Sequence, residues 1–351
     1  MKKFLIVLGC IIGVIILAIA AALLTYRVKE YRPDDVEDVS VENQQSRMLK
    51  SDETVSIMTY NTGYGALSKD QDCYFDGGQT VVPESIDIIN KNVEGMVNTV
   101  KEQNTDLYFL QEVDRDAKRS YNMDQLPLYQ KATNYATMFA CNFKVFYVPF
   151  NKGMGNVEAG IVTMSKYKVD SATRYQLPIS FSWPVSMMNL KRCLLETRIP
   201  IDGSDKELVL VNLHLEAYDS GEGKIAQTKQ LMDLLSKEYK KGNYVIAGGD
   251  FNQTFEPVKD KYPLTQDTIQ NEKWAPGIIE NKDLAEGFTF AVTDNAATCR
   301  LDDHVLDETT QLYIIDGFIV SDNIEVQEVT NLDKGFEFTD HNPVKMVFKM
   351  K

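Results

Sequence analysis

Residues 244–252 have the sequence YVIAGGDFN, in which an apolar, strand-forming run gives way to two glycines and then to polar side chains. Residues two apart in an extended chain lie on one face, so Asp250 and Asn252 are predicted to point the same way. A carboxylate and an amide at the end of a buried strand are costly unless they have partners. This stretch therefore predicts a strand that delivers polar groups to a binding or catalytic site.

The same arrangement recurs at five further places where a predicted strand meets polar residues. Taken singly, such a residue is more often a turn or capping residue than a functional one. Six strand ends that all carry acids, amides or a histidine nevertheless indicate a hydrolytic site. Only three histidines occur in the chain, and two of them fall in this set, while His304 is expected in an exposed loop. The residues at these five places are Asn61, Glu112, Asn212, His214, Asp316, Asp340 and His341.

Strand patterns dominate the chain from Val55 onward, and two segments have helical periodicity. Ser85 is expected to cap one helix with Ile86 on its inner face, and a second helix is expected at residues 224–240 with Ile225 facing inward. Many strands are apolar on both faces, as expected between a second sheet and covering helices. The sequence thus predicts a two-sheet α/β sandwich flanked by helices and preceded by one N-terminal transmembrane helix. The predicted strands cover residues 55–61, 107–112, 137–148, 159–164, 190–199, 208–215, 244–250, 312–320, 324–329 and 344–349.

An uninterrupted apolar run of 21 residues covers residues 4–24 and follows Lys2 and Lys3. At 1.5 Å per residue, a helix of this length matches the ~30 Å hydrocarbon core of a bilayer. A cleaved signal peptide is the alternative, with an A-x-A-like site at residues 18–20, although such peptides usually have an apolar core of ~7–15 residues. A lipoprotein site at Cys10 is disfavoured because the run continues well past it. The length favours an uncleaved anchor that contacts the membrane through residues 4–24.

The chain is predicted to divide into a membrane anchor or signal peptide at residues 1–26, a linker at 27–53 and a catalytic domain at 54–351. The linker is polar and lacks apolar periodicity, which is typical of a solvated tether. Basic residues flank both ends of the apolar run, so their distribution does not decide the orientation. A very short N-terminal tail before a long C-terminal domain favours a single-pass protein of the cell membrane with its catalytic domain extracellular. Secretion after signal cleavage is the alternative.

The charge balance is strongly acidic. The net charge is −14, and it becomes −16 beyond the apolar run because Lys2 and Lys3 precede that run. An acidic surface repels polyanions, and no stretch combines clustered Lys and Arg with aromatics, so a nucleic-acid partner is not excluded but is not favoured. The five cysteines are far apart without a CxxC pair, which does not match a zinc-ligand pattern. Free thiols are the simpler interpretation, and one or two disulfides stay open.

Six short motifs resemble, in order, those of the endonuclease/exonuclease/phosphatase superfamily. One such motif is weakly specific, whereas six in order over about residues 54–351 are very specific. The motifs are MTYN (58–61), QEVD (111–114), NLHL (212–215), GDFN (249–252), IDGF (315–318) and TDHNP (339–343). Residues 159–167 also resemble the glycine-led central strand of that superfamily. The segments DGG (76–78), RSY (119–121) and TCR (298–300) resemble a branch of mostly uncharacterised bacterial members.

The resemblance implies a divalent-metal-dependent phosphoesterase that uses Mg²⁺ or Mn²⁺. An ionised carboxylate suits hard Mg²⁺, so Glu112 is the expected main ligand, and the resemblance puts Asn61 and Asp340 beside it.

The remaining motif residues receive catalytic and phosphate-binding roles from the same resemblance. Asp250 is expected to orient or deprotonate the attacking water, and His341 to bind phosphate or act as general acid or base. Asp316 resembles the carboxylate that holds this imidazole, and His214 the second imidazole. Asn252 and Asn212 are expected to hydrogen-bond phosphate oxygens.

The substrate is predicted to be a small phosphoester or a phospholipid headgroup. The apolar residues 181–188 are most simply core, and if exposed they would dock on lipid beside the anchor. A surface nuclease acting on DNA or RNA is the first alternative. The second is a non-catalytic extracellular binding module, which loss of several motif residues would mark, and none is lost.

Overall fold

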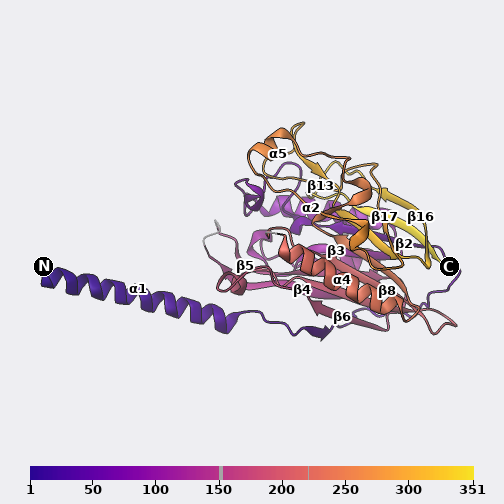
Figure 1. Cartoon of the computed structure of the whole chain (residues 1–351), viewed down its shortest axis with the longest axis horizontal. Coiled ribbons are helices and arrows are strands. Elements are labelled where there is room, and N and C mark those ends of the chain that lie inside the picture. Colours follow the sequence, from indigo (N-terminus) through magenta and orange to yellow (C-terminus); the bar gives the residue numbers. More distant parts are fainter. Residues whose placement is uncertain (150–152, 220) are drawn as a thin grey trace.

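The computed structural model of the chain describes residues 1–149, 153–219 and 221–351. Two mixed β-sheets pack face to face with helices on their outer faces, which confirms the predicted sandwich (Figure 1). In spatial order, the seven-stranded sheet contains β1 (Val36–Asp38), β6 (Ser171–Gln176), β7 (Cys193–Pro200), β8 (Glu207–His214), β9 (Tyr244–Asp250), β15 (Asp316–Ser321) and β12 (Phe288–Ala291). The six-stranded sheet contains β16 (Ile324–Asn331), β17 (Val344–Met350), β2 (Val55–Asn61), β3 (Leu107–Asp114), β5 (Gly155–Ser165) and β4 (Ala136–Val148).

Each sheet has one parallel strand pair that is joined through a covering helix. The pair β2–β3 is connected by α2 (Ile86–Gln103), and the pair β8–β9 by α4 (Glu222–Tyr239). Parallel neighbours require such a crossover, because a short hairpin turn would make them antiparallel. The strands β2 and β3 contact β9 across the sandwich. The carboxyl ends of these central strands therefore meet at one end of the molecule.

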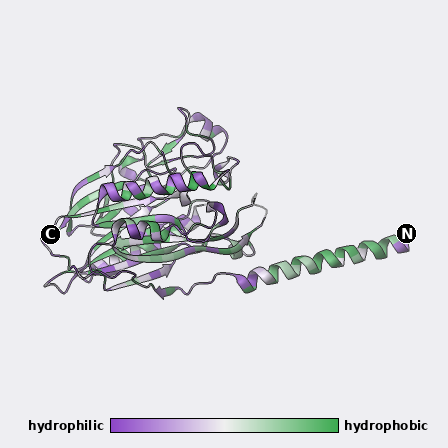
Figure 2. Ribbon diagram, turned by 180° about the vertical axis from the view of Figure 1, so that it is seen from behind, coloured by the Kyte–Doolittle hydropathy of each residue, from purple (hydrophilic) through white to green (hydrophobic). Residues whose placement is uncertain are grey.

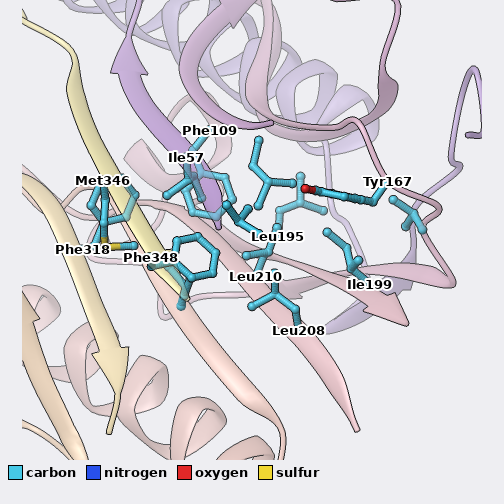
Figure 3. Close-up of a cluster of buried hydrophobic side chains, with 14 of the residues drawn as sticks. Ile57, Phe109, Tyr167, Leu195, Ile199, Leu208, Leu210, Phe318, Met346 and Phe348 are labelled. Carbon is cyan, nitrogen blue, oxygen red and sulfur yellow. The ribbon is translucent and has the colours of Figure 1, made fainter. Parts of the chain in front are cut away.

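Alternation along each strand creates three apolar layers. In β2, Ile57 joins the core between the sheets, which Figure 3 shows, whereas Met58 joins the layer under α2. In β8, Leu210 faces the inter-sheet core, and Val211 packs with Leu231 of α4. Burying one such side chain contributes roughly 1.5–3 kcal/mol. This double-sided burial explains why the central strands lack a polar face until they end.

Two details of the predicted helices are wrong. Ser85 precedes α2, but its side chain makes no capping hydrogen bond, and Ile86 is 43% exposed. Ile225 is 70% exposed, because the inner face of the first turns of α4 is formed by Lys224 and Gln227. A residue next to Lys224 is turned by about 100° around the helix axis and points away from the sheet.

Much of the predicted solvated tether packs on the sandwich instead. The strand β1 pairs with β6, and Glu42 forms an isolated bridge with Thr137. Leu49 is fully buried in the inter-sheet core. A few apolar side chains are enough to fix a polar segment to the domain. The prediction of a solvated tether rested on the polar composition of the segment and missed these side chains.

The N-terminal helix α1 (Lys2–Lys29) is long and apolar enough to cross a membrane, and none of its apolar window is buried against the domain. Figure 2 shows its hydrophobic colouring along nearly its whole length, in contrast to the mixed colouring of the domain helices. Its last turns contact the domain, where the Tyr26 hydroxyl donates to the Tyr147 carbonyl at 3.1 Å.

Several smaller elements were not predicted, and one predicted strand is divided. The segment 312–320 contains β14 (Leu312–Tyr313) and the start of β15, separated by two residues. The strand β7 begins at Cys193, three residues later than predicted. The unpredicted elements include β1, β6, β12, α3 (Leu126–Thr133), α5 (Gln266–Gln270), β10 (Gln253–Phe255), β11 (Gly277–Ile279) and β13 (Cys299–Arg300).

Candidate active site

A cavity of about 460 Å³ opens at the end of the sandwich where the central strands terminate. One part of its wall is polar and carries most of the predicted site residues, and another part is apolar. Its polar residues include Asp76, Glu112, Arg119, Arg192, His214, Glu216, Asp250, Asn252, Arg300, Asp340 and His341. Its apolar and aromatic residues include Phe75, Phe143, Val148, Met154, Phe181, Met188, Leu190, Tyr218 and Trp274.

Both sheets contribute residues to the candidate site. Asn61 ends β2, and its Nδ2 donates to Oδ2 of Asp250, which ends β9, at 3.0 Å. Nε2 of His214, at the end of β8, lies 3.4 Å from the same oxygen. Gly249 permits this approach, since its φ is +146° and a Cβ there would lie 2.0 Å from the Leu213 carbonyl oxygen. The glycine before the aspartate is thus required by the close packing of β9 on β8.

Glu112 reaches the cavity through an irregularity in β3. The register with β5 shifts between Leu110 and Val113, and Glu112 has a φ of +57°. That left-handed conformation costs a residue with a Cβ roughly 1–2 kcal/mol. Burial raises the pKa of the Glu112 carboxyl to about 7, with Arg119 opposing the shift and Asp340 adding to it. The strained backbone therefore presents a carboxylate that binds a proton or a cation readily.

A buried carboxylate holds the imidazole of His341. Nδ1 of His341 lies 2.8 Å from Oδ2 of Asp316, and Nε2 lies 3.8 Å from Oδ2 of Asp250. The hydroxyl of Thr298 accepts from the backbone N–H groups of Ile315 and Asp316, which fixes the start of β15. Burial opposes a charge on His341, but the Asp316 carboxylate outweighs it, so the pKa of His341 is raised well above its usual range.

The second imidazole, His214, favours the neutral form, whereas His341 favours the charged form. Burial, together with the positive charges of Arg192 and His341, lowers the pKa of His214 well below its usual value. Burial also raises the pKa of Asp250 to about 6, with His341 opposing that shift. The site thus holds a charged and a neutral imidazole on either side of one carboxylate, and such a separation of pKa values is typical of acid and base partners.

The expected metal ligands form a set of hard oxygen donors. Glu112 and Asp340 line the cavity, and the Asn61 side chain places Nδ2 3.4 Å from Oε1 of Glu112, while its Oδ1 accepts from the Gly63 N–H at 3.0 Å. Gly63 is needed here, because its φ is +47° and a Cβ would lie 2.9 Å from Oδ1 of Asp340. Carboxylate and amide oxygens are the ligands that Mg²⁺ prefers. This donor set therefore fits the expected divalent cation.

Asn252 lines the cavity next to Asp250. Its backbone N–H donates to Oδ1 of Asp250 at 2.8 Å, and its Nδ2 donates to the Leu215 carbonyl at 2.9 Å. Its φ of +50° is another left-handed conformation, which turns the chain sharply at the end of β9. Asn252 thus lies on the cavity wall, and its role in binding phosphate stays a prediction.

Asn212 lies elsewhere, and the geometry corrects its predicted phosphate-binding role. The side chain is fully buried between the sheets, where Nδ2 donates to the carbonyls of Val162 (2.8 Å) and Leu110 (3.3 Å). Its Oδ1 accepts from Nε2 of Gln111 at 2.8 Å. Asn212 shares a strand face with His214 but lies about 7 Å deeper, two residues along the strand. All its polar atoms are engaged in joining the two sheets, which leaves none for a substrate.

Several cavity residues had no predicted role. Arg119 makes a bidentate contact with Asp114 (2.8 and 3.1 Å) and lies 3.7 Å from the ring centroid of Tyr64. Nη1 of Arg192 donates to the His214 carbonyl at 3.2 Å. The RSY and TCR segments signalled Arg119 and its counterpart Arg300 without assigning them a function, whereas nothing in the sequence signalled Arg192. These buried guanidinium groups supply positive potential that the mean charge of the chain conceals.

The fold and this constellation of carboxylates, amides and imidazoles define the class of phosphoester hydrolases. The chain belongs to the Endonuclease/Exonuclease/phosphatase family, whose profile matches residues 58–341. Comparison with curated proteins found no match.

Solved structures share the fold at low sequence identity. An endonuclease/exonuclease/phosphatase from Beutenbergia cavernae is 17% identical with a TM-score of 0.56, over 85% of this chain and 72% of that one. A family member from Bacteroides vulgatus is 15% identical with a TM-score of 0.52, over 85% and 100% of the chains. The human Nocturnin catalytic domain with bound sulfate is 14% identical with a TM-score of 0.52, over 88% and 98%.

Proposed function

We propose that this protein is a divalent-metal-dependent hydrolase that cleaves a phosphate ester presented at the extracellular face of the membrane, with a phospholipid headgroup as the substrate class. One observation carries this proposal: the cavity has a polar wall and an apolar wall, and the apolar residues Val148 and Met188 belong to segments that contact the candidate membrane helix. A small water-soluble phosphoester would not require that placement.

The contact between the helix and the domain is specific. The ring centroids of Tyr26 and Phe146 are 4.8 Å apart, and Nζ of Lys29 lies 4.6 Å from the Phe146 centroid. Nζ of Lys191 forms an ion pair with Glu30 at 3.2 Å, and both side chains are buried. Lys191 directly follows Leu190 of the apolar cavity wall. These contacts keep the cavity close to the end of the membrane span.

Five exposed apolar side chains lie in the two segments that also carry the cavity residues Val148, Phe181 and Met188. We define them as the apolar rim, which consists of Phe146, Tyr147, Ile179, Trp183 and Val185. Their exposed fractions are 38%, 49%, 45%, 62% and 49%. Aromatic residues are favoured at membrane interfaces, where the ring is buried among headgroups and its polar edge stays wet. The exposure of Trp183 and Val185 supports lipid docking by residues 181–188, whereas Met187 of the same segment is core.

The site residues account for the steps of phosphoester hydrolysis. Glu112, with Asp340 and Asn61, would hold Mg²⁺ or Mn²⁺, which when bound polarises the phosphate and stabilises the leaving oxygen. The Asp250 carboxylate, fixed by Asn61, accepts the proton of the attacking water. The charged His341 donates to a phosphate oxygen or protonates the leaving group. The neutral His214 contributes a second ring nitrogen beside Asp250.

The test is a hydrolysis screen with the purified full-length chain in phospholipid vesicles, with Mg²⁺ or Mn²⁺. The substrates are phospholipids that differ in headgroup, sphingomyelin, nucleotides, RNA and plasmid DNA, and the His341→Ala variant provides the background. We expect release of a phosphorylated or dephosphorylated headgroup above the rates on the soluble substrates.

The apolar rim gives a second arm to this test. The Trp183→Ser variant should be slower on vesicles but unchanged on a soluble chromogenic phosphodiester. Plasmid nicking that exceeds lipid hydrolysis and is abolished by His341→Ala would instead establish a surface nuclease. A chain that cleaves none of these substrates would favour a binding module.

A further inference from the structure

A second group of metal-ligating side chains lies at the cavity wall, apart from Glu112 and Asn61, and two of its three members line the cavity. Sγ of Cys73 and carboxylate oxygens of Asp76 and Asp302 all lie within 4.8 Å of one another. Cys73 precedes a short 3₁₀ turn, η2 (Tyr74–Asp76), which Asp76 ends, and Asp302 follows β13. Two distant segments of the chain thus bring a thiol and two carboxyl groups together.

Asp302 is the member of this group that requires a ligand. Its side chain is fully buried, and neither carboxylate oxygen has a hydrogen-bond partner among the described residues. A buried carboxylate without a partner is unfavourable unless a proton or a cation neutralises it. Burial and the neighbouring Asp76 accordingly raise the pKa of Asp302 well above its usual range.

The basic side chain that interacts most closely with Asp302 is engaged elsewhere. Arg300 donates to the backbone carbonyls of Ser68 and Gln71, each at 3.0 Å, and to the His304 carbonyl at 3.2 Å. It therefore ties the two segments together without making a hydrogen bond to the Asp302 carboxylate. The Asp302 carboxylate therefore remains free to bind a cation.

Backbone hydrogen bonds hold the group in place. The Cys73 N–H donates to the Asp302 carbonyl at 2.6 Å, and the Asp76 N–H donates to the Cys73 carbonyl at 3.2 Å. The Tyr218 hydroxyl donates to Oδ1 of Asp76 at 2.7 Å, which orients that carboxylate. A preorganised ligand set of this kind loses little entropy when it binds an ion.

We propose that Cys73, Asp76 and Asp302 form a second cation site that takes a borderline-soft divalent ion, Zn²⁺ in the first place. A thiolate with carboxylates suits Zn²⁺ better than Mg²⁺. With a Zn–S bond of ~2.3 Å and Zn–O bonds of ~2.0–2.2 Å, donors on one ion lie within about 4.5 Å, so a small inward movement closes the site. Binding displaces the thiol proton of Cys73 and any proton on the acid pair.

Three protein ligands leave a fourth position of a tetrahedral ion free. Cys73 and Asp76 line the same cavity as Glu112 and His341, so that position faces the place proposed for the phosphate. The ion would add positive charge beside the acidic residues of this wall. The proposed cation site does not depend on the proposed hydrolytic function, because its test measures metal binding and not hydrolysis.

The experiment is a Co²⁺ titration of the metal-free full-length protein, followed by competition with Zn²⁺. Binding of Co²⁺ through Cys73 should release protons and give the near-ultraviolet thiolate-to-Co²⁺ absorption band, and Zn²⁺ should abolish the band by displacing Co²⁺. The variants Cys73→Ser and Asp302→Asn should weaken binding at this site at least tenfold, and the thiolate band should disappear in Cys73→Ser. The Glu112→Gln variant should keep the band, because Glu112 belongs to the other set of ligands.

Cys299→Ser is the matched control, since Cys299 is also buried and its thiol belongs to a different group, with Asp340 and His341. The band should persist in this variant. Absence of any thiolate band in the native protein, or its loss in Cys299→Ser alone, would overturn the proposal. If Cys73→Ser does not fold, Asp302→Asn decides: unchanged Co²⁺ affinity in that variant excludes the site.

Discussion

Nδ1 of His341 lies 2.8 Å from Oδ2 of Asp316, and this contact joins two segments that are otherwise 25 residues apart in the chain. Because Asp316 engages one ring nitrogen, the other faces Asp250 and Asn61 at the cavity. The carboxylate thus sets both the direction of the ring and its charge, as in other carboxylate–imidazole pairs.

Replacement of this carboxylate should change the pH dependence of catalysis. In Asp316→Asn, the raised pKa of His341 should fall, so His341 loses its proton at a lower pH. The alkaline limb of the pH–kcat profile should therefore shift to lower pH. General acid–base assistance is worth roughly 10²–10⁴-fold, and a loss of that order is expected near neutral pH. The exposed Asp322→Asn is the control for a pH–rate profile. An alkaline limb that stays in place would show that His341 does not act in its charged form.

Metal affinity should depend on pH through Glu112. The pKa of this carboxyl is raised to about 7 in the protein, so protons compete with the cation below that pH. The apparent affinity for Mn²⁺ should therefore rise roughly tenfold per unit up to about pH 7 and then level off. Calorimetric titrations over this range test the slope, and Glu112→Gln should bind weakly at every pH. The exposed Glu325→Gln should behave as the native protein.

Three residues should act as one catalytic unit. Glu112→Ala, Asp250→Ala and His341→Ala are each expected to reduce turnover by several orders of magnitude, because the three side chains serve one step around a shared phosphate. Double variants should lose little more than the worst single variant. Chelation should stop the reaction, and Mg²⁺ or Mn²⁺ should restore it. Additive losses in steady-state kinetics, or full activity in metal-free buffer, would contradict the mechanism.

Asn212→Ala should affect stability and not substrate binding. The variant leaves the Val162 carbonyl and Nε2 of Gln111 without partners between the sheets, which should lower the free energy of unfolding by about 2–3 kcal/mol. In a domain of this size, that corresponds to a fall in Tm of several degrees, roughly 2–4 °C per kcal/mol. Measurements of Tm and of KM on the same variant distinguish a structural role of Asn212 from a role in binding phosphate. A higher KM with an unchanged Tm would restore the phosphate-binding assignment.

The orientation of the chain can be tested with external protease on intact cells. Because β1 and Leu49 pack on the sandwich, the accessible segment is short and lies near residues 32–35. Cleavage there should release a fragment that begins close to β1 and retains the whole sandwich. Protection until the cells are lysed would reverse the orientation. A soluble mature protein that begins near Ala21 would show that the apolar run is a signal peptide.

The strand ends could be predicted because their chemistry is local. Glu112 and Asp250 follow apolar runs, and the change from buried strand to polar group is visible within a few residues of sequence. The role of Asn212 could not be predicted this way, because it depends on Leu110 and Val162, which belong to the opposite sheet. For the same reason, the sequence did not reveal the buried Arg192 or the packing of Leu49, since both depend on contacts with distant segments.

The division of the polar wall between the sheets has a consequence for biogenesis. Asn61 and Asp250 are 189 residues apart, and Asn61 and His341 are 280 residues apart, yet each pair is in contact. Neither the segment around Asn61 nor the segment around Asp250 forms the site alone, because His341 is needed as well. Loop closure over such separations is slow. A polypeptide that has not yet been extended to His341 therefore lacks the candidate site, which forms only when these three distant segments have been brought together.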